Sequence, residues 1–267
     1  MLTPPAPGET AEPTLGIATT LPLRREGREK LTGEALYTDD LVFPGAWYGA
    51  AIRSSEAHAK LLGLEQDPEF DWSKVVVMTA ADIPGDNVVS IIIDDMPALA
   101  DGEITHHSQP VALLAAPDKA TLREARKRIR PRTEPLPPIF DPEESEHLFA
   151  AYEITQGDPD AAFGQATLIV QGEYRVGHQE QLYIENQAMI AEPRPDGGIT
   201  IRGSMQCPYY VHSALKRALA LSDTQAVITQ AETGGAFGGK EDFPSVVAIH
   251  ADLLAQRLGK PVRMIYD

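Results

Sequence analysis

The sequence predicts an α+β fold in two parts, and three observations support this prediction. Short apolar or β-branched runs alternate with turn residues along most of the chain, as expected for strands. Three longer segments instead place apolar residues at helical spacing. These segments are residues 118–129, 209–221 and 244–258. The proline-rich stretch Thr133–Phe140 cannot be helical and indicates an extended connector. We therefore predict a tail at residues 1–24, a domain at about 25–145 and a second domain at about 155–267.

The first domain is predicted to consist of strands followed by one helix. The tail before it is rich in proline and is expected to be extended. The expected strands are residues 47–53, 59–64, 75–78, 88–93 and 110–116. The run Val75–Met78 is β-branched and is expected to be buried. A helix is expected over Asp118–Ile129, with Asp118 as its N-cap and Pro131 ending it.

The second domain is predicted to alternate strands and helices. The expected strands are residues 166–175, 183–192, 198–203, 226–231 and 261–266. Pro195–Gly198 is typical of a hairpin turn. Helices are expected over Tyr209–Leu221 and Pro244–Leu258, and Gly259 is suited to cap the second one. Because nothing follows the strand at 261–266, we expect it to lack a partner unless another chain or further sequence covers it.

Composition excludes several classes of function. The 267 residues carry a net charge of −16, which disfavours phosphate backbones and anionic lipid as partners. The single cysteine, Cys207, forms no internal disulfide and cannot alone ligate an iron–sulfur cluster. The seven histidines show no paired zinc spacing. With no signal-peptide pattern and no apolar run of about 20 residues, we expect a soluble cytoplasmic protein.

A glycine-rich loop, Thr233–Glu241, lies between a predicted strand and a predicted helix. Glycines at such a place let the backbone approach a ligand, and the helix N-terminus supplies free N–H donors. The spacing Gly234-x-x-x-x-Gly239-Lys240 fits a phosphate-binding P-loop. The next residue, however, is Glu241, where that motif needs a hydroxyl side chain for magnesium. Nucleotide binding is therefore an alternative interpretation of this loop.

The same loop resembles the molybdenum-proximal loop of xanthine dehydrogenases and aldehyde oxidases. Residues 234–241 read Gly-Gly-Ala-Phe-Gly-Gly-Lys-Glu, an ordered match of eight residues. The stretch Gly177–Glu185 is similar to a second family segment and departs from it at Gln181, where the family often has His. Four shorter stretches also resemble the family, one of them with Ser108 in place of Gly. They are residues 53–60, 79–85, 108–111 and 134–137, so that the resemblance extends from about residue 25 to 267.

This resemblance implies a fold, an activity and partners. The fold would be an α/β-hammerhead-like domain followed by the first part of a molybdopterin-binding α+β domain. The activity would be hydroxylation of an N-heterocycle or an aldehyde, with molybdenum held on molybdopterin and carrying oxo and sulfido ligands. The 2Fe-2S clusters and FAD would belong to partner subunits or domains. The remaining C-terminal half of the subunit would be a further partner.

The resemblance also implies roles for four residues. Gln179 would hydrogen-bond an oxygen ligand of molybdenum, and Phe237 and Gly238 would bring the backbone close to the metal ligands. Glu241 would orient the substrate. The family's catalytic base is expected beyond residue 267, so that the chain alone is expected to be inactive. Ordinary roles remain open, namely a surface amide, a core aromatic and a carboxylate at a helix N-terminus, as does a non-catalytic assembly role for the whole chain.

Overall fold

The computed structural model describes residues 24–89 and 93–266. The chain forms two compact units, Met1–Ala35 and Leu36–Asp267. In the first unit, helix α1 (Gly27–Thr32) ends at Gly33, whose φ of 77° is left-handed. The sequence did not predict this helix, because its six residues bury no side chain and so show no apolar periodicity. The predicted tail lies outside the described residues except for Arg24.

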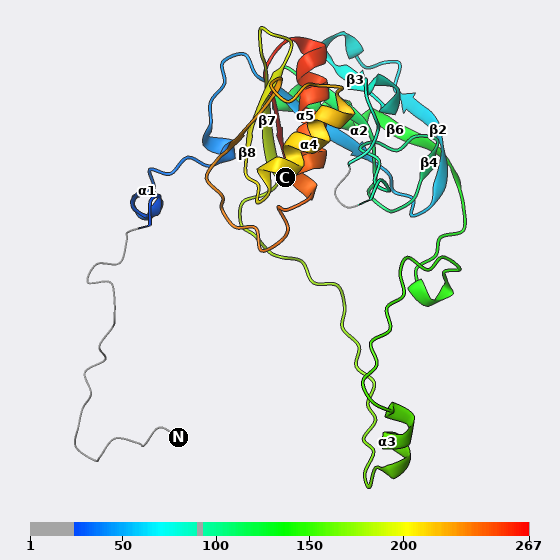
Figure 1. Cartoon of the computed structure of the whole chain (residues 1–267). Coiled ribbons are helices and arrows are strands. Elements are labelled where there is room, and N and C mark those ends of the chain that lie inside the picture. Colours follow the sequence, from blue (N-terminus) through cyan, green and yellow to red (C-terminus); the bar gives the residue numbers. More distant parts are fainter. Residues whose placement is uncertain (1–23, 90–92, 267) are drawn as a thin grey trace, which may run out of the picture. The chain divides into compact units, whose positions relative to one another are not determined.

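A seven-stranded sheet forms the centre of the second unit (Figure 1). Its strands lie in the order β3-β5-β1-β10-β7-β8-β9. Their bounds are β1 Trp47–Arg53, β3 Val76–Met78, β5 Pro110–Ala116, β7 Ala188–Pro193, β8 Ile199–Gly203, β9 Ala226–Gln230 and β10 Val262–Ile265. The pairs β1–β10 and β8–β9 are parallel, and the other pairs are antiparallel. Strands from both predicted domains therefore share one sheet, joined from Trp47↔Val262 to Gly49↔Met264.

A smaller antiparallel sheet has the order β4-β2-β6. Its strands are β4 Glu103–Ile104, β2 Ala59–Gln66 and β6 Ile129–Pro135. Pro131 and Pro135 lie within β6, which is an edge strand of this sheet. An edge strand tolerates proline because the missing N–H would face away from the neighbouring strand.

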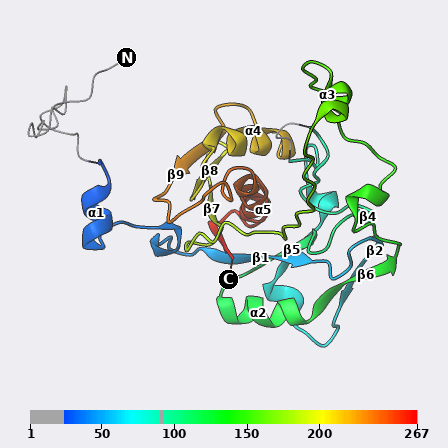
Figure 2. The same ribbon diagram turned by 90° about the horizontal axis from the view of Figure 1, so that it is seen from below.

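Helices cover both faces of the large sheet (Figure 2). The helices of this unit are α2 Lys119–Lys127, α3 Pro159–Gln165, α4 Pro208–Ala218 and α5 Phe243–Leu258, of which α3 buries no residue. Short 3-10 turns are Thr38–Asp40, Trp72–Lys74, Ala80–Asp82 and Pro142–Glu144. Helix α5 lies between the sheet and α4, and every residue from Pro244 to Ala255 is buried. Helix α2 and the small sheet lie on the opposite face.

Strand β5 shows why the chain contains a continuous apolar run. Leu113 and Ala115 pack into the core under α4 and α5, whereas Ala112 and Leu114 pack into the core under α2. A strand buried on both faces needs apolar residues at every position rather than at alternate ones. All seven residues of β5 are accordingly buried.

Most predicted elements are confirmed, including the hairpin of β7 and β8 and the caps of two helices, although the strand predicted to begin at Tyr183 begins at Ala188. Asp118 accepts a hydrogen bond from the Thr121 N–H, at 2.8 Å, and Gly259 ends α5 with a φ of 61°. The helix predicted to reach Ile129 ends at Lys127, however, because Ile129 already begins β6. Pro131 therefore does not end that helix.

One predicted strand is wrong. Residues Ala166–Arg175 form no strand and expose Leu168, Val170 and Tyr174, because β propensity produces a strand only where a neighbouring strand supplies hydrogen bonds. In the predicted strand Val88–Ile93, the described residues form a loop, and residues 90–92 lie outside the described part.

The last predicted strand also differs from expectation. The prediction that residues 261–266 form a strand without a partner is wrong, because β10 lies between β1 and β7 and pairs with both. The division into domains at 145–155 stays a prediction. The helices in the described ranges lack the length and apolar character that a membrane span requires.

Candidate functional site

The two sequence segments that carry the main resemblance meet at Glu185. The Glu185 Oε2 atom accepts hydrogen bonds from the Gly234 N–H at 2.8 Å and from Lys240 Nζ at 2.9 Å. The backbone N–H of Glu185 donates to the Gly234 carbonyl at 3.2 Å. The end of the stretch 177–185 thus fixes both ends of the glycine-rich loop.

Lys240 is fully buried, which decides between two interpretations of this loop. Besides its ion pair with Glu185, its Nζ atom donates to Ser204 Oγ at 3.1 Å and lies 4.9 Å from the centre of the Tyr183 ring. A P-loop lysine must instead reach the β- and γ-phosphates of its nucleotide. Lys240 is committed to holding the loop, so the geometry gives no support to nucleotide binding at this motif.

Glu185 remains charged in this setting. Burial alone would raise the pKa of its carboxyl group. Hydrogen bonds from Gly234, Lys240 and Ser204 outweigh burial and hold that pKa below its usual value. The charge of the partly buried Glu185 therefore compensates that of the fully buried Lys240.

The glycines of the loop meet two different needs. A Cβ atom at Gly234 would lie 2.5 Å from Glu185 Cβ, and one at Gly239 would overlap the Tyr183 ring. At Gly238, by contrast, a Cβ atom would meet nothing within 4 Å, but φ is +95°. Phe237 also has a positive φ, of 52°, which is unusual for a residue with a side chain. The loop is thus tightly packed at its ends and open at its tip.

Gln206 holds the tip of the loop in place. Its Oε1 atom accepts hydrogen bonds from the Gly238 N–H at 3.0 Å and from the Lys240 N–H at 3.3 Å. The backbone N–H of Gln206 donates to the Lys240 carbonyl at 2.7 Å. Gln206 could not be recognised from the sequence, because it lies 32 positions before Gly238 and belongs to no motif.

An open pocket of about 630 Å³ lies beside Gly238 and Gly239. It collects residues from the end of β1, the end of β10, the start of α5 and the segment before β7. Among its lining residues are Arg53, Gln181, Tyr183, Gln187, Gly238 and Tyr266. Residues from both predicted domains therefore contribute to this candidate site.

Gln187 brings an unused hydrogen-bond acceptor to this pocket. The side chain lines the pocket although the residue is only 5% exposed. Its Nε2 atom donates to the Gly239 carbonyl at 2.5 Å and to the Tyr183 hydroxyl at 3.0 Å. Its Oε1 atom is buried and has no hydrogen-bond partner among the described residues. Buried polar atoms are normally satisfied, so this acceptor calls for a donor from a ligand or from water.

Arg53 and Tyr266 form another wall of the pocket. Arg53 donates from Nη2 to the Tyr266 hydroxyl at 2.7 Å and from Nη1 to the Ser108 carbonyl at 2.8 Å. Burial raises the pKa of the Tyr266 phenol, and Arg53 opposes this shift. Ser108 has a φ of 66°, the left-handed conformation that glycine adopts most easily, at the position where the family pattern has Gly.

The four predicted site residues do not all line this pocket. Gly238 lines the pocket, and Phe237 precedes it with a side chain that is 76% exposed. Glu241 is exposed and donates its N–H to the Gly238 carbonyl at 3.3 Å, while the following residue, Asp242, lines the pocket. Gln179 is exposed and is not among the lining residues.

Gln179 and Phe237 are thus not brought together in one pocket, and their expected roles stay predictions. Gln181, which stood out in the sequence only as a departure from the family pattern, lines the pocket instead. Gln187 was missed because a single buried amide gives no sequence signal. No group of three or more His, Cys, Asp or Glu side chains in the described part of the chain is placed to hold a metal ion.

Two family models match the chain in succession. The aldehyde oxidase and xanthine dehydrogenase a/b hammerhead domain matches residues 32–137, and the molybdopterin cofactor-binding domain matches residues 140–267. The nicotinate dehydrogenase large molybdopterin subunit of Eubacterium barkeri is 31% identical over 250 residues, covering 89% of this chain and 58% of that protein. Xanthine dehydrogenase 1 of Arabidopsis thaliana is 30% identical over 251 residues, covering 90% of this chain and 18% of that protein.

Solved structures show the same fold. Quinoline 2-oxidoreductase from Pseudomonas putida superposes with a TM-score of 0.75 at 24% identity, covering 92% of this chain and 34% of that one. Aldehyde oxidoreductase from Desulfovibrio gigas gives a TM-score of 0.77 at 22% identity, covering 91% and 30%. The chain therefore spans 58% or less of these relatives and structures.

Proposed function

Because the chain belongs to the xanthine dehydrogenase and aldehyde oxidase family, we propose that it forms part of the molybdenum-binding subunit of an oxidoreductase. The reaction would be hydroxylation of an N-heterocycle or an aldehyde. The names of three relatives refer to nitrogen heterocycles, namely nicotinate, xanthine and quinoline. The names of others refer to aldehydes, so the proposal covers both substrate classes.

The pocket beside Gly238 fits a molybdopterin cofactor by two observations. The space next to the Gly238 Cα atom is open, so that a Cβ atom there would project into a cavity and not into protein. The buried Gln187 Oε1 atom lacks a donor among the described residues and suits an N–H group of a pterin ring. A pterin dithiolene brings its own sulfur ligands, so the protein needs hydrogen-bonding groups here and not a set of metal ligands.

The bound cofactor would supply the metal centre at which oxygen is transferred to an electron-poor carbon. The residues of this chain would bind and orient it. Gln187 and Gln181 would offer neutral amides, which keep their hydrogen bonds while the charge of the centre changes. Gly238 would let the backbone approach, and Gln206 would keep that backbone in position through its bonds to Gly238 and Lys240.

Three further residues are carried over from the resemblance. We expect Gln179 to hydrogen-bond an oxygen ligand of the metal, Phe237 to bring the backbone near it, and Glu241 to orient the substrate. Partner subunits or domains would carry 2Fe-2S clusters and FAD, and the catalytic base would come from polypeptide outside these residues. A purely structural assembly role is the alternative, and cofactor content distinguishes the two.

The test is the cofactor content of Gly238→Val. We expect the wild-type protein, purified from a molybdopterin-producing host, to contain molybdenum by mass spectrometry and an oxidised pterin by fluorescence. Gly238→Val should lose at least about tenfold in both, because the side chain would fill the space that the cofactor needs. Gly45→Val is the matched control, since Gly45 also has a positive φ, +75°, with open space around it, but lies outside the pocket.

Thermal unfolding of both variants separates loss of cofactor from loss of fold. Equal cofactor content in Gly238→Val and the wild type would place the cofactor elsewhere. Absence of cofactor from the wild-type protein would favour the assembly role.

A further inference from the structure

A second pocket, of about 550 Å³, has five cationic side chains among its thirteen lining residues, and we call it the basic pocket. Its cations are Lys119, Arg123 and Arg126 of α2, Arg53 at the end of β1 and Arg263 of β10. Asp39 is the only carboxylate among the described residues that line it. The chain as a whole carries a net charge of −16, so this concentration of positive charge runs against the overall composition.

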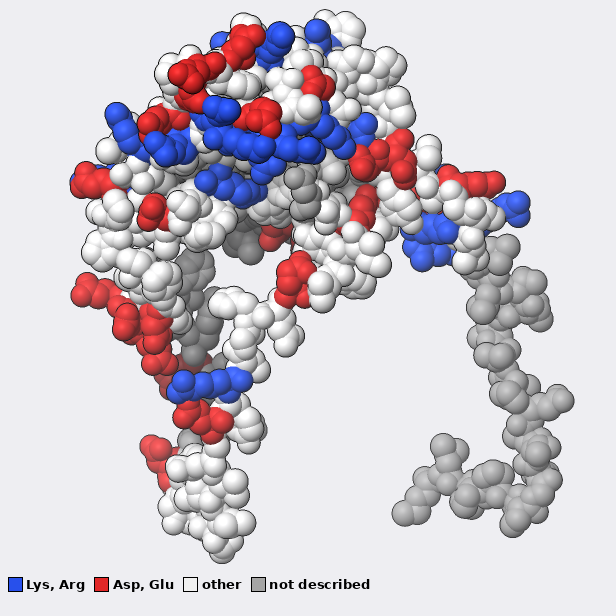
Figure 3. All heavy atoms as spheres, turned by 180° about the vertical axis from the view of Figure 1, so that it is seen from behind, with Lys and Arg blue, Asp and Glu red and all other residues white. Residues whose placement is uncertain are grey.

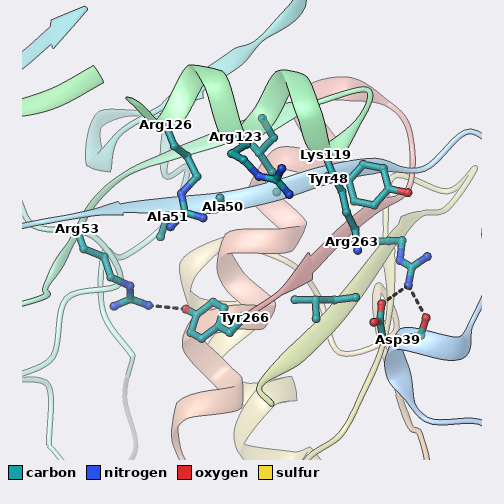
Figure 4. A pocket seen from close by; sticks show the side chains of 13 residues that line it. Asp39, Tyr48, Ala50, Ala51, Arg53, Lys119, Arg123, Arg126, Arg263 and Tyr266 are labelled. Carbon is teal, nitrogen blue, oxygen red and sulfur yellow. Dashed lines mark hydrogen bonds and ion pairs between the residues drawn. The ribbon is translucent and has the colours of Figure 1, made fainter. Parts of the chain in front are cut away.

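The basic pocket lies between helix α2 and the large sheet (Figure 4). Gly49, Ala50 and Ala51 of β1 are among the residues that line it. Lys119, Arg123 and Arg126 extend from α2 over β1. On the molecular face shown in Figure 3, Lys and Arg side chains gather in one band with acidic side chains around it.

The cations on α2 are arranged at a cost to the helix. Lys119 and Arg123 are four residues apart and Arg123 and Arg126 three apart, so all three lie along one helix face. Like charges at these spacings repel each other and destabilise a helix. The carboxylate of this helix, Glu124, pairs with Lys127, which is not among the residues lining the pocket. Solubility does not require these cations to lie on one helix face, and a bound anion would offset the repulsion between them.

The remaining cations are only partly neutralised within the protein. Arg263 forms an ion pair with Asp39 at 2.9 Å, and its buried Nε atom has no hydrogen-bond partner in the described part of the chain. Arg53 donates to two neutral groups, the Tyr266 hydroxyl and the Ser108 carbonyl. Arg123 forms no hydrogen bond or ion pair within the described residues. Guanidinium groups are the side chains best suited to hold phosphate through paired hydrogen bonds.

The arrangement of the cations identifies the ligand class. Lys119 and Arg126 are seven residues apart on α2, which corresponds to about 10 Å along the helix axis. One phosphate group cannot contact side chains spread over this length and across to β10, so the ligand must carry several anionic groups. Strand β1 has β5 and β10 on its two sides and offers no free edge to an added peptide strand. The volume suits a small molecule.

We propose that the basic pocket binds a small polyphosphate ligand, such as the polyphosphate portion of a nucleotide, held by the arginines of α2 together with Arg53 and Arg263. This proposal is independent of the proposed cofactor site, although Arg53 and Tyr266 line both pockets. The binding is electrostatic and is expected to weaken as salt concentration rises.

Isothermal titration calorimetry of the full chain with inorganic tripolyphosphate at low salt tests the proposal. We expect saturable binding by the wild type and binding weaker by at least about tenfold in Arg123→Gln/Arg126→Gln. Lys127→Gln/Arg130→Gln is the matched control, because it removes the same charge from neighbouring exposed positions outside the pocket. The control should bind tripolyphosphate within about twofold of the wild type.

Three results would overturn the proposal. One is no binding by the wild type up to about 1 mM tripolyphosphate. Another is equal weakening in both double variants, which would indicate unspecific attraction. The third is tighter binding of a glutamate-rich peptide than of tripolyphosphate, which would make the pocket a docking surface for an acidic polypeptide.

Discussion

Membership of a sequence motif does not tell whether a cation is exposed to a ligand, as Lys240 and the cations of the basic pocket show. Lys240 belongs to the most recognisable motif of the sequence, yet it is fully buried and paired with Glu185 at 2.9 Å. Arg123 and Arg126 belong to no motif, yet they are exposed and line a pocket. A cation inside a ligand-binding motif is therefore not necessarily the group that meets the ligand.

The physical difference lies in the counter-ion. A buried ammonium group requires a paired charge, and Glu185 supplies it together with hydrogen bonds from the loop. Arg123 and Arg126 of α2 are exposed to solvent, so their charges need no buried counter-ion. The first arrangement fixes a backbone conformation, and the second leaves charge available to a ligand.

The largest effect is expected from breaking the buried pair. Lys240→Met should lower the free energy of unfolding by about 3–5 kcal/mol, because it leaves the partly buried Glu185 carboxylate without its counter-ion. Urea unfolding followed by circular dichroism measures this change. Arg123→Met, the corresponding change at an exposed cation, should stay within about 0.5 kcal/mol of the wild type.

The double variant Lys240→Met/Glu185→Gln refines this result. Removing both charges should restore part of the lost stability, since no uncompensated charge remains. If Lys240→Met proved as mild as Arg123→Met, the buried pair would not be what holds the loop.

A buried acid without a counter-ion extends the comparison. Asp252 of α5 is fully buried, neither of its carboxylate oxygens has a hydrogen-bond partner among the described residues, and burial raises its pKa to about 7. Because the pKa of Asp252 is higher in the folded state than in the unfolded state, protonation of Asp252 favours folding. This contribution to the free energy of unfolding is fully present below about pH 4 and is lost as pH rises through about 7. Asp252→Asn should remove this loss. The free energy of unfolding of the variant, relative to that of the wild type, should therefore rise by about 2–4 kcal/mol between pH 4 and 7.

The measurement is the difference between the two unfolding free energies across this pH range. Burial lowers the pKa of His250 to about 4, so its contribution is lost in the opposite direction, as pH falls below about 6.5. His250 is present in both proteins, and its effect cancels in the difference. A flat difference curve would show that Asp252 titrates normally.

The sequence predicted those features that depend on neighbouring residues. The apolar run of β5, the Asp118 cap and the Gly259 cap are all determined within a few residues, and all are present in the structure. The strand predicted at Ala166–Arg175 is wrong, because local β propensity says nothing about whether a partner strand is present.

The features that the sequence could not predict join distant positions. The pairing of β10 with β1 joins residues more than two hundred positions apart, as does the hydrogen bond from Arg53 to Tyr266. The cations of the basic pocket come from β1, α2 and β10, so no charged run marks them along the chain. At the candidate site, Gly238 was predicted from its motif, whereas Gln187 and Gln206 become recognisable only through their contacts.

The smallest expected effects separate packing from backbone strain within the glycine-rich loop. Gly234→Ala should lower the free energy of unfolding by about 2 kcal/mol, because its Cβ atom would lie 2.5 Å from Glu185 Cβ and disturb the contact that positions the ion pair with Lys240. Gly238→Ala should cost only about 1 kcal/mol, because its Cβ atom meets open space and the penalty comes from a φ of +95° alone. Urea unfolding of both variants gives the two values. Equal costs would mean that backbone strain, and not the close packing against Glu185, governs the loop at both positions, and the distinction between its anchored end and its open tip would then fail.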